Sequence, residues 1–287
     1  MTFSIVAFDP NPSPPEWGVA VASKFLAVGA VVPWARAGAG ALATQALANL
    51  AYGPEGLDLL SQGLSADEVV ERLTGADEGS AHRQLGVVDA GGRAATFTGG
   101  ECLDWAGGVT GDHFCCQGNI LTGPDVVEAM AETFTSTEGE LAVRLLAALR
   151  AGDERGGDSR GRQGAGIYVV REGGGYGGGI DKAVDLRVDD SSDPIGELER
   201  LWELHRLYFP RPEDLEFIPV DDELAGRLRT RLRELGYDPG DGTGYDRQLR
   251  DALWAYCGTE NLEERWTEDP TLDRGILSHL LPHPFST

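Results

Sequence analysis

The chain has 287 residues, of which 41% are hydrophobic and 25% charged, so it can bury a core and is not wholly disordered. It carries 24 Lys and Arg against 47 Asp and Glu, and the resulting net charge of −23 disfavours nucleic acid and anionic lipid as partners. No apolar run reaches the length of a membrane-spanning helix, so we expect no membrane segment.

Short β-rich segments open the chain, before the pattern changes near residue 53. The first two are separated by a proline-rich link and predict a hairpin, and the fourth is a strand or a loop: residues 3–9, 17–23, 28–35 and 38–45. Residues 38–43 match a relaxed GxGxxA nucleotide motif. Because a hairpin precedes them in place of a βαβ unit, a glycine-rich turn is the favoured interpretation.

Helical periodicity follows from Pro54, and Ser65 and Glu68 form a capping-box pattern ahead of a second helix. Beyond it we expect, in order, a hairpin over 84–98, a strand over 113–121, helices over 124–134 and 138–149, a polar loop over 153–163, strands over 166–170 and 184–188, and a helix over 194–208. The strands come in antiparallel sets and do not alternate singly with helices. This order predicts an α+β fold and argues against a doubly wound parallel sheet.

A domain boundary is indicated by Pro210, Pro212 and Pro219. We therefore predict one domain over residues 1–210 and a small all-α module over residues 220–287, whose leucines recur at helical spacing.

The N-terminus lacks the basic and apolar regions of a secretory signal, which predicts a cytoplasmic protein. The cysteines agree with this, because Cys115 and Cys116 are adjacent, Cys102 and Cys257 are isolated, and no CxxC pair occurs. We read Cys115 and Cys116 as core residues. Neither the cysteines nor the histidines have the spacing of metal ligands, so we expect no metal and no cofactor.

Thr2 is the candidate for nucleophilic chemistry. Removal of Met1 would leave Thr2 with a free α-amine, whose reference pKa of roughly 7.7–8.0 suits a base acting on its own hydroxyl. Lys24, one of only two lysines, ends the strand expected to pair with the first. An ammonium beside Thr2 would lower the pKa of the amine and stabilise developing negative charge.

Several segments resemble the DUF1028 family, in order and over residues 2–209: residues 2–7, 18–35, 43–45, 117–123, 156–163 and 184–190. That family is assigned by similarity to the N-terminal-nucleophile (Ntn) hydrolase superfamily. The resemblance implies a four-layer αββα sandwich with Thr2 at the nucleophile position and Lys24 as its candidate assistant. Folds of this superfamily often assemble, so a homo-oligomer is a candidate state.

The resemblance also suggests residues that bind substrate or an oxyanion. Amide side chains could donate to an oxyanion, two arginines could clamp a carboxylate, and one serine shares a strand face with Thr2. These candidates are Ser4, Gln45, Gln117, Asn119, Asp158, Arg160 and Arg162. For the amides and the loop residues, an ordinary turn or solvated loop is an equal alternative.

The C-terminal tail resembles a peptidoglycan-binding-like module. Aromatic platforms for a sugar are available at Tyr237, Tyr245, Trp254, Tyr256 and Trp266. A helical packing or dimerisation module is the alternative interpretation of this tail.

Two functions follow for the whole chain. The first is metal-free hydrolysis of an amide in a small molecule or peptide through a Thr2 acyl-enzyme. The second is an Ntn-like scaffold that binds a ligand or partner without turnover.

Overall fold

The computed structural model describes residues 2–281, and the chain divides into two compact units, residues 1–201 and 202–287. Helix α5 (Pro194–Tyr208) runs through this division. The predicted mixture of helices and antiparallel sheets is confirmed, because every strand pair in the described residues is antiparallel. The two units are described separately.

The larger sheet of the first unit has six strands in the order β10-β9-β2-β1-β8-β7. Its strands are β1 (Thr2–Asp9), β2 (Glu16–Ser23), β7 (Gly107–Gly111), β8 (Phe114–Asn119), β9 (Gly164–Val170) and β10 (Lys182–Val188). All eight residues of β1 are buried, so this strand is covered on both faces. The start of β1 therefore lies inside the unit and between two neighbouring strands.

The smaller sheet has four strands in the order β3-β4-β5-β6. These are β3 (Pro33–Arg36), β4 (Gly40–Ala46), β5 (Arg83–Asp89) and β6 (Ala94–Thr98). It packs face to face on the larger sheet, with β4 against β1 and β5 against β8. Small and branched side chains such as Val6, Val21, Ala41 and Val88 fill most of this interface.

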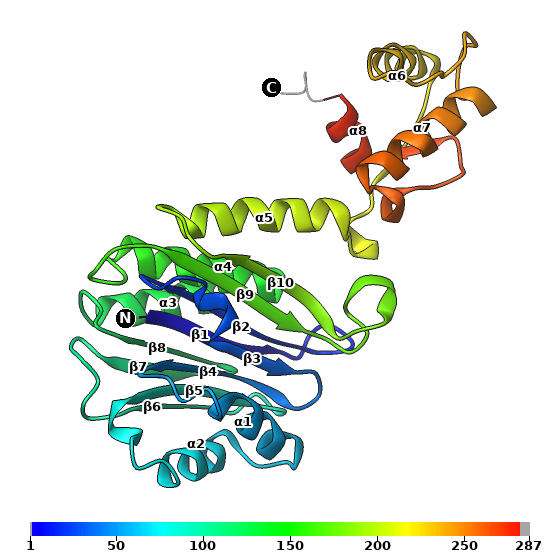
Figure 1. Ribbon diagram of the computed structural model, residues 1–287. Helices are drawn as coiled ribbons and strands as arrows, with labels where there is room; N and C mark the ends of the chain where they lie inside the picture. Colours follow the sequence, from blue (N-terminus) through cyan, green and yellow to red (C-terminus); the bar gives the residue numbers. More distant parts are fainter. Residues whose placement is uncertain (1, 282–287) are drawn as a thin grey trace. The chain divides into compact units, whose positions relative to one another are not determined.

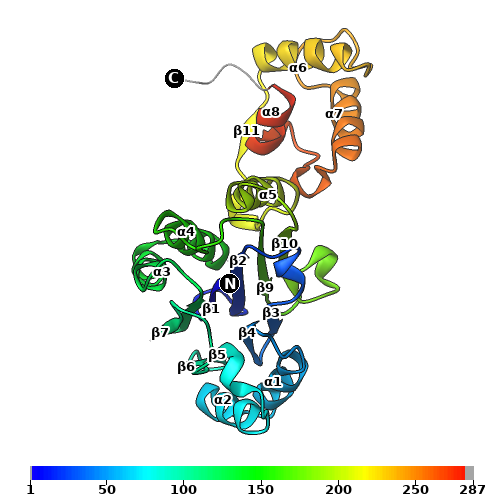
Figure 2. The same cartoon turned by 60° about the vertical axis from the view of Figure 1, so that its left-hand side comes forward.

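A pair of helices covers the outer face of each sheet (Figures 1 and 2). Helices α3 (Asp125–Ser136) and α4 (Leu141–Glu154) lie on the larger sheet, and α1 (Tyr52–Ser61) and α2 (Ala66–Gly75) lie on the smaller one. The predicted capping box of Ser65 and Glu68 is confirmed at the start of α2. Both sheets thus have two buried faces.

The sequence-based prediction was wrong at two strands. Residues 28–35 form a 3₁₀ turn (Val28–Ala30) and then the short β3, because Ala27 has φ 53° and Gly29 lies against the backbone of Gly166. Strand β7 was missed because three of its five residues are glycine, which weakens any strand signal.

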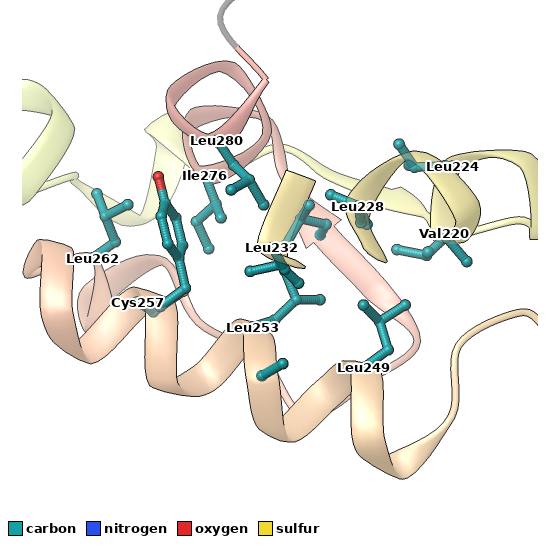
Figure 3. Close-up of a cluster of buried hydrophobic side chains, with 14 residues drawn as sticks. Val220, Leu224, Leu228, Leu232, Leu249, Leu253, Cys257, Leu262, Ile276 and Leu280 are labelled. Carbon is teal, nitrogen blue, oxygen red and sulfur yellow. The ribbon is translucent and has the colours of Figure 1, made fainter. Parts of the chain in front are cut away.

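The second unit contains α6 (Asp222–Glu234), α7 (Arg247–Glu260) and α8 (Arg274–Leu280) around a leucine-rich cluster (Figure 3). The prediction of an all-α module needs correction, because β11 (Phe217–Pro219) pairs with β12 (Thr271–Asp273). Each of these strands has only three residues, which is too short for an alternating pattern to be recognised.

The second unit also buries an ion pair, in which Arg265 Nη1 lies 2.7 Å from Asp273 Oδ1. The rest of this guanidinium donates to the carbonyl oxygens of Arg206 and Leu207. Because its donors are bound by fixed acceptors, Arg265 connects the end of α5 with β12 inside this unit.

Candidate functional site

Polar side chains gather between the two sheets of the first unit, in a region otherwise filled by apolar groups. On the larger sheet Thr2 pairs with Asn119, and Ser4 with Gln117, while on the smaller sheet Gln45 pairs with Gln84. All six residues are at most 6% exposed. We call this set, Thr2, Ser4, Gln45, Gln84, Gln117 and Asn119, the interlayer polar cluster.

Ser4 joins two amides of the cluster. Its hydroxyl donates to Gln45 Oε1 at 2.6 Å and accepts from Gln117 Nε2 at 2.6 Å. Gln117 Nε2 also donates to the backbone oxygen of Ser4 at 3.3 Å. The amide donors of Gln117 are therefore directed at Ser4.

Gln84 holds the cluster together, although it was not among the site residues predicted from the sequence. Its Oε1 accepts from Gln45 Nε2 at 2.8 Å and from Asn119 Nδ2 at 2.9 Å. Its Nε2 donates to Gly118 O at 2.7 Å and to Thr98 Oγ1 at 2.9 Å. A glutamine at the head of an apolar strand is a signal that could have identified it.

Thr2 lies at the edge of this cluster, as the first residue of β1. Its hydroxyl oxygen is 3.1 Å from that of Ser23, the last residue of β2. Its backbone oxygen accepts from Gln45 Nε2 at 3.4 Å. The Thr2 hydroxyl thus contacts the neighbouring strand of its own sheet, and its backbone oxygen contacts the smaller sheet. Ser23 was not among the site residues predicted from the sequence.

Lys24 is exposed, directly after Ser23. Its Nζ donates to the backbone oxygen of Arg162 at 3.2 Å, and its backbone N–H donates to Asp158 Oδ2 at 2.7 Å. The structure thus places Lys24 with the loop of residues 155–163. The contact observed for its ammonium is with that loop and not with Thr2.

This loop lies along the end of β8. Leu121 and Asp158 form an isolated bridge, and Ser159 N donates to Ile120 O at 3.3 Å. Asp158 is 6% exposed, and its carboxylate also accepts from the backbone N–H of Arg160 at 2.9 Å and lies 3.3 Å from Arg160 Nη2. Asp158 therefore fixes the loop against both strand ends.

A pocket of about 440 Å³ lies beside this loop. Its walls come from the start of β1, the end of β2, the end of α4, the loop, and the start of α5 with the residues just before it. The residues that line it are Phe3, Ala22, Ser23, Asp153, Gly156, Asp158, Gly161, Arg162, Ser192, Pro194 and Ile195. Thr2 is not one of these residues, but Ser23 both lines the pocket and contacts the Thr2 hydroxyl.

Charged groups are linked along the pocket wall. Asp153 Oδ1 accepts from Arg162 Nε at 2.8 Å, and Asp153 Oδ2 lies 3.9 Å from Arg150 Nη1. Arg150 also makes a two-point contact with Glu199, at 3.0 and 2.6 Å. Hydrogen bonding to Asp153 raises the pKa of Arg162, and hydrogen bonding to Glu199 raises that of Arg150, so both remain cationic.

The structure thus separates the predicted site residues into two sets. Thr2, Ser4, Gln45, Gln117 and Asn119 belong to the interlayer polar cluster, whereas Lys24, Asp158, Arg160 and Arg162 surround the loop beside the pocket. Ser23 connects the sets.

Cys115 and Cys116 are fully buried core residues, as predicted. Burial raises the pKa of the Cys115 thiol to about 12 and that of Cys116 well above its usual range. Within residues 2–281, no three His, Cys, Asp or Glu side chains are grouped closely enough to hold a metal ion. In the same residues, no helix combines the length and the apolar character that a bilayer span needs.

Comparison with known families gives two matches. Residues 2–198 match DUF1028, described as "Family of unknown function (DUF1028)", and residues 208–280 match PG_binding_2, described as "Putative peptidoglycan binding domain". The chain therefore belongs to the DUF1028 family, and the resemblance noted in the sequence is confirmed.

A solved structure with similarity in both sequence and fold supports this membership. It is the crystal structure of protein SPO2555 from Silicibacter pomeroyi, which carries the same family description. The two chains are 36% identical, with a TM-score of 0.65, and the match covers 71% of this chain and 86% of that one. The comparison with curated proteins gave no match.

Proposed function

We propose that the protein is an N-terminal-nucleophile amide hydrolase in which Thr2 attacks the substrate. The observation that carries this proposal is the position of Thr2 at the start of the central strand β1, with its hydroxyl beside Ser23, a wall residue of the pocket. Two antiparallel sheets enclosed by two helix pairs support the four-layer αββα Ntn sandwich that the family resemblance implies.

The proposed reaction uses the α-amine that becomes free when Met1 is removed. The amine takes the proton of Thr2 Oγ1, and Oγ1 forms a bond to the carbonyl carbon of the amide. The C–N bond then breaks, and the leaving amine takes the proton from the Thr2 ammonium. The same amine then deprotonates a water molecule, whose oxygen forms a bond to the ester carbonyl carbon. The C–Oγ1 bond breaks, Oγ1 takes the proton back from the ammonium, and the acid is released.

The interlayer polar cluster suggests roles for the amides. Gln45 and Gln117 donate within the cluster, so we assign them to positioning Thr2 and Ser4. Asn119 pairs with Thr2 across the strands, and one N–H of its amide goes to Gln84. Its second N–H makes Asn119 the cluster's candidate donor to the oxyanion.

The experiment is a screen of small amides and peptides with the wild-type protein and Thr2→Ala side by side. Alanine is also small enough to permit Met1 removal, so the variant keeps a free α-amine and loses the hydroxyl together with the γ-methyl group. We expect hydrolysis of at least one amide by the wild type and none above the uncatalysed rate by the variant. Equal turnover by both proteins would remove Thr2 from the mechanism.

The second candidate function is ligand binding without turnover. It is favoured by one observation, that Thr2 does not itself line the pocket. Retention of Met1, together with ligand binding and no hydrolysis in the screen, would support this alternative, because a blocked Thr2 has no free amine.

A further inference from the structure

Arg162 presents an oriented cation to the pocket. Its side chain is 50% exposed and lines the pocket, and Nε is fixed by Asp153 Oδ1 at 2.8 Å. Among the described residues, Nη1 and Nη2 of Arg162 have no hydrogen-bond partner. A guanidinium held at Nε with both Nη nitrogens unused is suited to two-point contact with a carboxylate.

Lys24 adds a second cation next to the pocket wall: it follows the wall residue Ser23, although it is not itself one of the residues that line the pocket. Its Nζ lies 3.2 Å from the backbone oxygen of Arg162, and it forms no ion pair within residues 2–281. The other lysine, Lys182, is instead paired with Asp185 at 3.0 Å. In a chain with 47 acidic and 24 basic side chains, the charge of Lys24 is thus left without an acidic partner.

The acidic groups of the pocket wall are already balanced. Asp153 lies between Arg162 and Arg150, at 2.8 and 3.9 Å. Asp158 lies 3.3 Å from Arg160 and accepts the backbone N–H of Lys24. These carboxylates therefore hold the arginines of the wall in place. Lys24 Nζ and the two Nη nitrogens of Arg162 remain available to bind an incoming anion.

The first turn of α5 borders the same pocket, through Pro194 and Ile195. A helix N-terminus favours negative charge, although Asp193 Oδ1 already accepts the backbone N–H of Gly196 there at 3.2 Å. A carboxylate of the chain itself therefore already occupies this helix end, and the anion site is defined by Lys24 and Arg162.

We propose that Lys24 and Arg162 form an anion-binding rim at this pocket, so that the substrate is an amide carrying a carboxylate away from its reacting bond. This inference rests on the proposed function, whose substrate class it names. Lys24 then binds substrate and does not tune the Thr2 amine, and Asp153 is a positioning residue for Arg162.

The test measures binding to full-length Thr2→Ala protein by calorimetry or NMR titration, with two probes of nearly equal size. Glutaramate has one amide and one carboxylate, and glutaramide has two amides and no charge. Inorganic phosphate is a third probe, because an anion rim could also hold a phosphate. Lys24→Gln and Arg162→Gln are then made in the Thr2→Ala chain, with Lys182→Gln as the matched control.

We expect glutaramate to bind more tightly than either glutaramide or phosphate. The dissociation constant of glutaramate should rise by about tenfold or more in Lys24→Gln and in Arg162→Gln, because each loses a charged contact, and should not change in Lys182→Gln. Melting curves identify a misfolded variant. If Arg162→Gln unfolds because Asp153 loses its partner, the exposed Lys24→Gln decides the result.

Equal binding of glutaramate and glutaramide, binding of neither, or no change in Lys24→Gln would overturn the proposal. Tighter binding of phosphate would overturn the assignment to a carboxylate. Because Thr2→Ala cannot form the acyl-enzyme, this result does not depend on turnover. If glutaramate binds at this rim but the wild type hydrolyses no amide, the anion-binding site is supported and the proposed hydrolase function is contradicted.

Discussion

Among single residues, Ser4 tests the interlayer polar cluster most sharply. Ser4→Ala removes a fully buried hydroxyl and leaves Gln45 Oε1 and Gln117 Nε2 short of a partner. Each buried group left unpaired costs roughly 1–3 kcal/mol. We therefore expect a clear loss in the free energy of unfolding, measured by urea denaturation.

Ser136→Ala is the matched control, because its hydroxyl is exposed and bonds only to carbonyl oxygens of its own helix. Its stability should stay within roughly 0.5 kcal/mol of the wild type. If the two variants lose similar amounts, the cluster contributes little to the fold.

A second prediction at the residue scale concerns pH. The Asp77 carboxylate accepts four hydrogen bonds, from Arg83 Nε, Gly79 N, Asn49 Nδ2 and Tyr52 Oη. These bonds, and the one from Arg83 most of all, hold the pKa of the Asp77 carboxyl far below its usual value. A lowered folded-state pKa stabilises the fold above the unfolded pKa, and this stability is lost as the pH falls. Asp77→Asn should therefore reduce the difference in unfolding free energy between pH 7 and pH 3.

Denaturant unfolding at the two pH values measures that difference. Glu172→Gln provides the comparison, because the Glu172 side chain is exposed and makes no hydrogen bond or ion pair within residues 2–281, so the variant should keep the pH dependence of the wild type. An Asp77→Asn protein with the full wild-type pH dependence would contradict the role given to this carboxyl.

Among the elements, helix α6 contains a glycine with no structural need for one. Gly226 is exposed, has open space where a Cβ would lie and has an ordinary helical φ. Gly226→Ala should stabilise the second unit by roughly 0.5–1 kcal/mol, because alanine loses less entropy in a helix. A thermal melt of the full chain measures this.

Gly236, just past the end of α6, also has open space, but its φ is +88°. Gly236→Ala should therefore lower the melting temperature through backbone strain alone. Stabilisation by both variants, or by neither, would show that the backbone conformation is not what separates the two positions.

The elements also show how far sequence reasoning reaches. The hairpin over 84–98 and the capping box at Ser65 were predictable because alternation and capping are local signals. Strand β7 and the β11–β12 pair were not, because a glycine-rich edge strand and three-residue strands depend on their partners for recognition.

The same limit applies to the site. Thr2 and the amides of β4 and β8 were recognisable from the family resemblance, and β-strand alternation put Ser4 on the same face as Thr2. Gln84 and Ser23 could be recognised only from the paired strands. Gln84 contacts Asn119, 35 residues away in the sequence, and Ser23 contacts Thr2, 21 residues away. The spacing of residues along the sequence does not reveal which distant residues contact one another.

At the scale of the whole molecule, the two units have separate cores. In the second unit the buried cluster begins at Val220, and in the first unit the buried apolar residues extend to Leu198. A chain ending at residue 210 should therefore stay soluble and unfold in one cooperative transition. Aggregation or a gradual melt of that shortened chain would show that the tail is part of the first core.

The central claim is that Thr2 acts with a free α-amine, and the mass of the intact purified wild-type protein tests it without any knowledge of the substrate. Thr2 is small enough for Met1 to be removed, so we predict the mass of a chain that begins at Thr2. A protein that largely retains Met1 would contradict the assignment, because an acylated amine cannot serve as the base for the Thr2 hydroxyl.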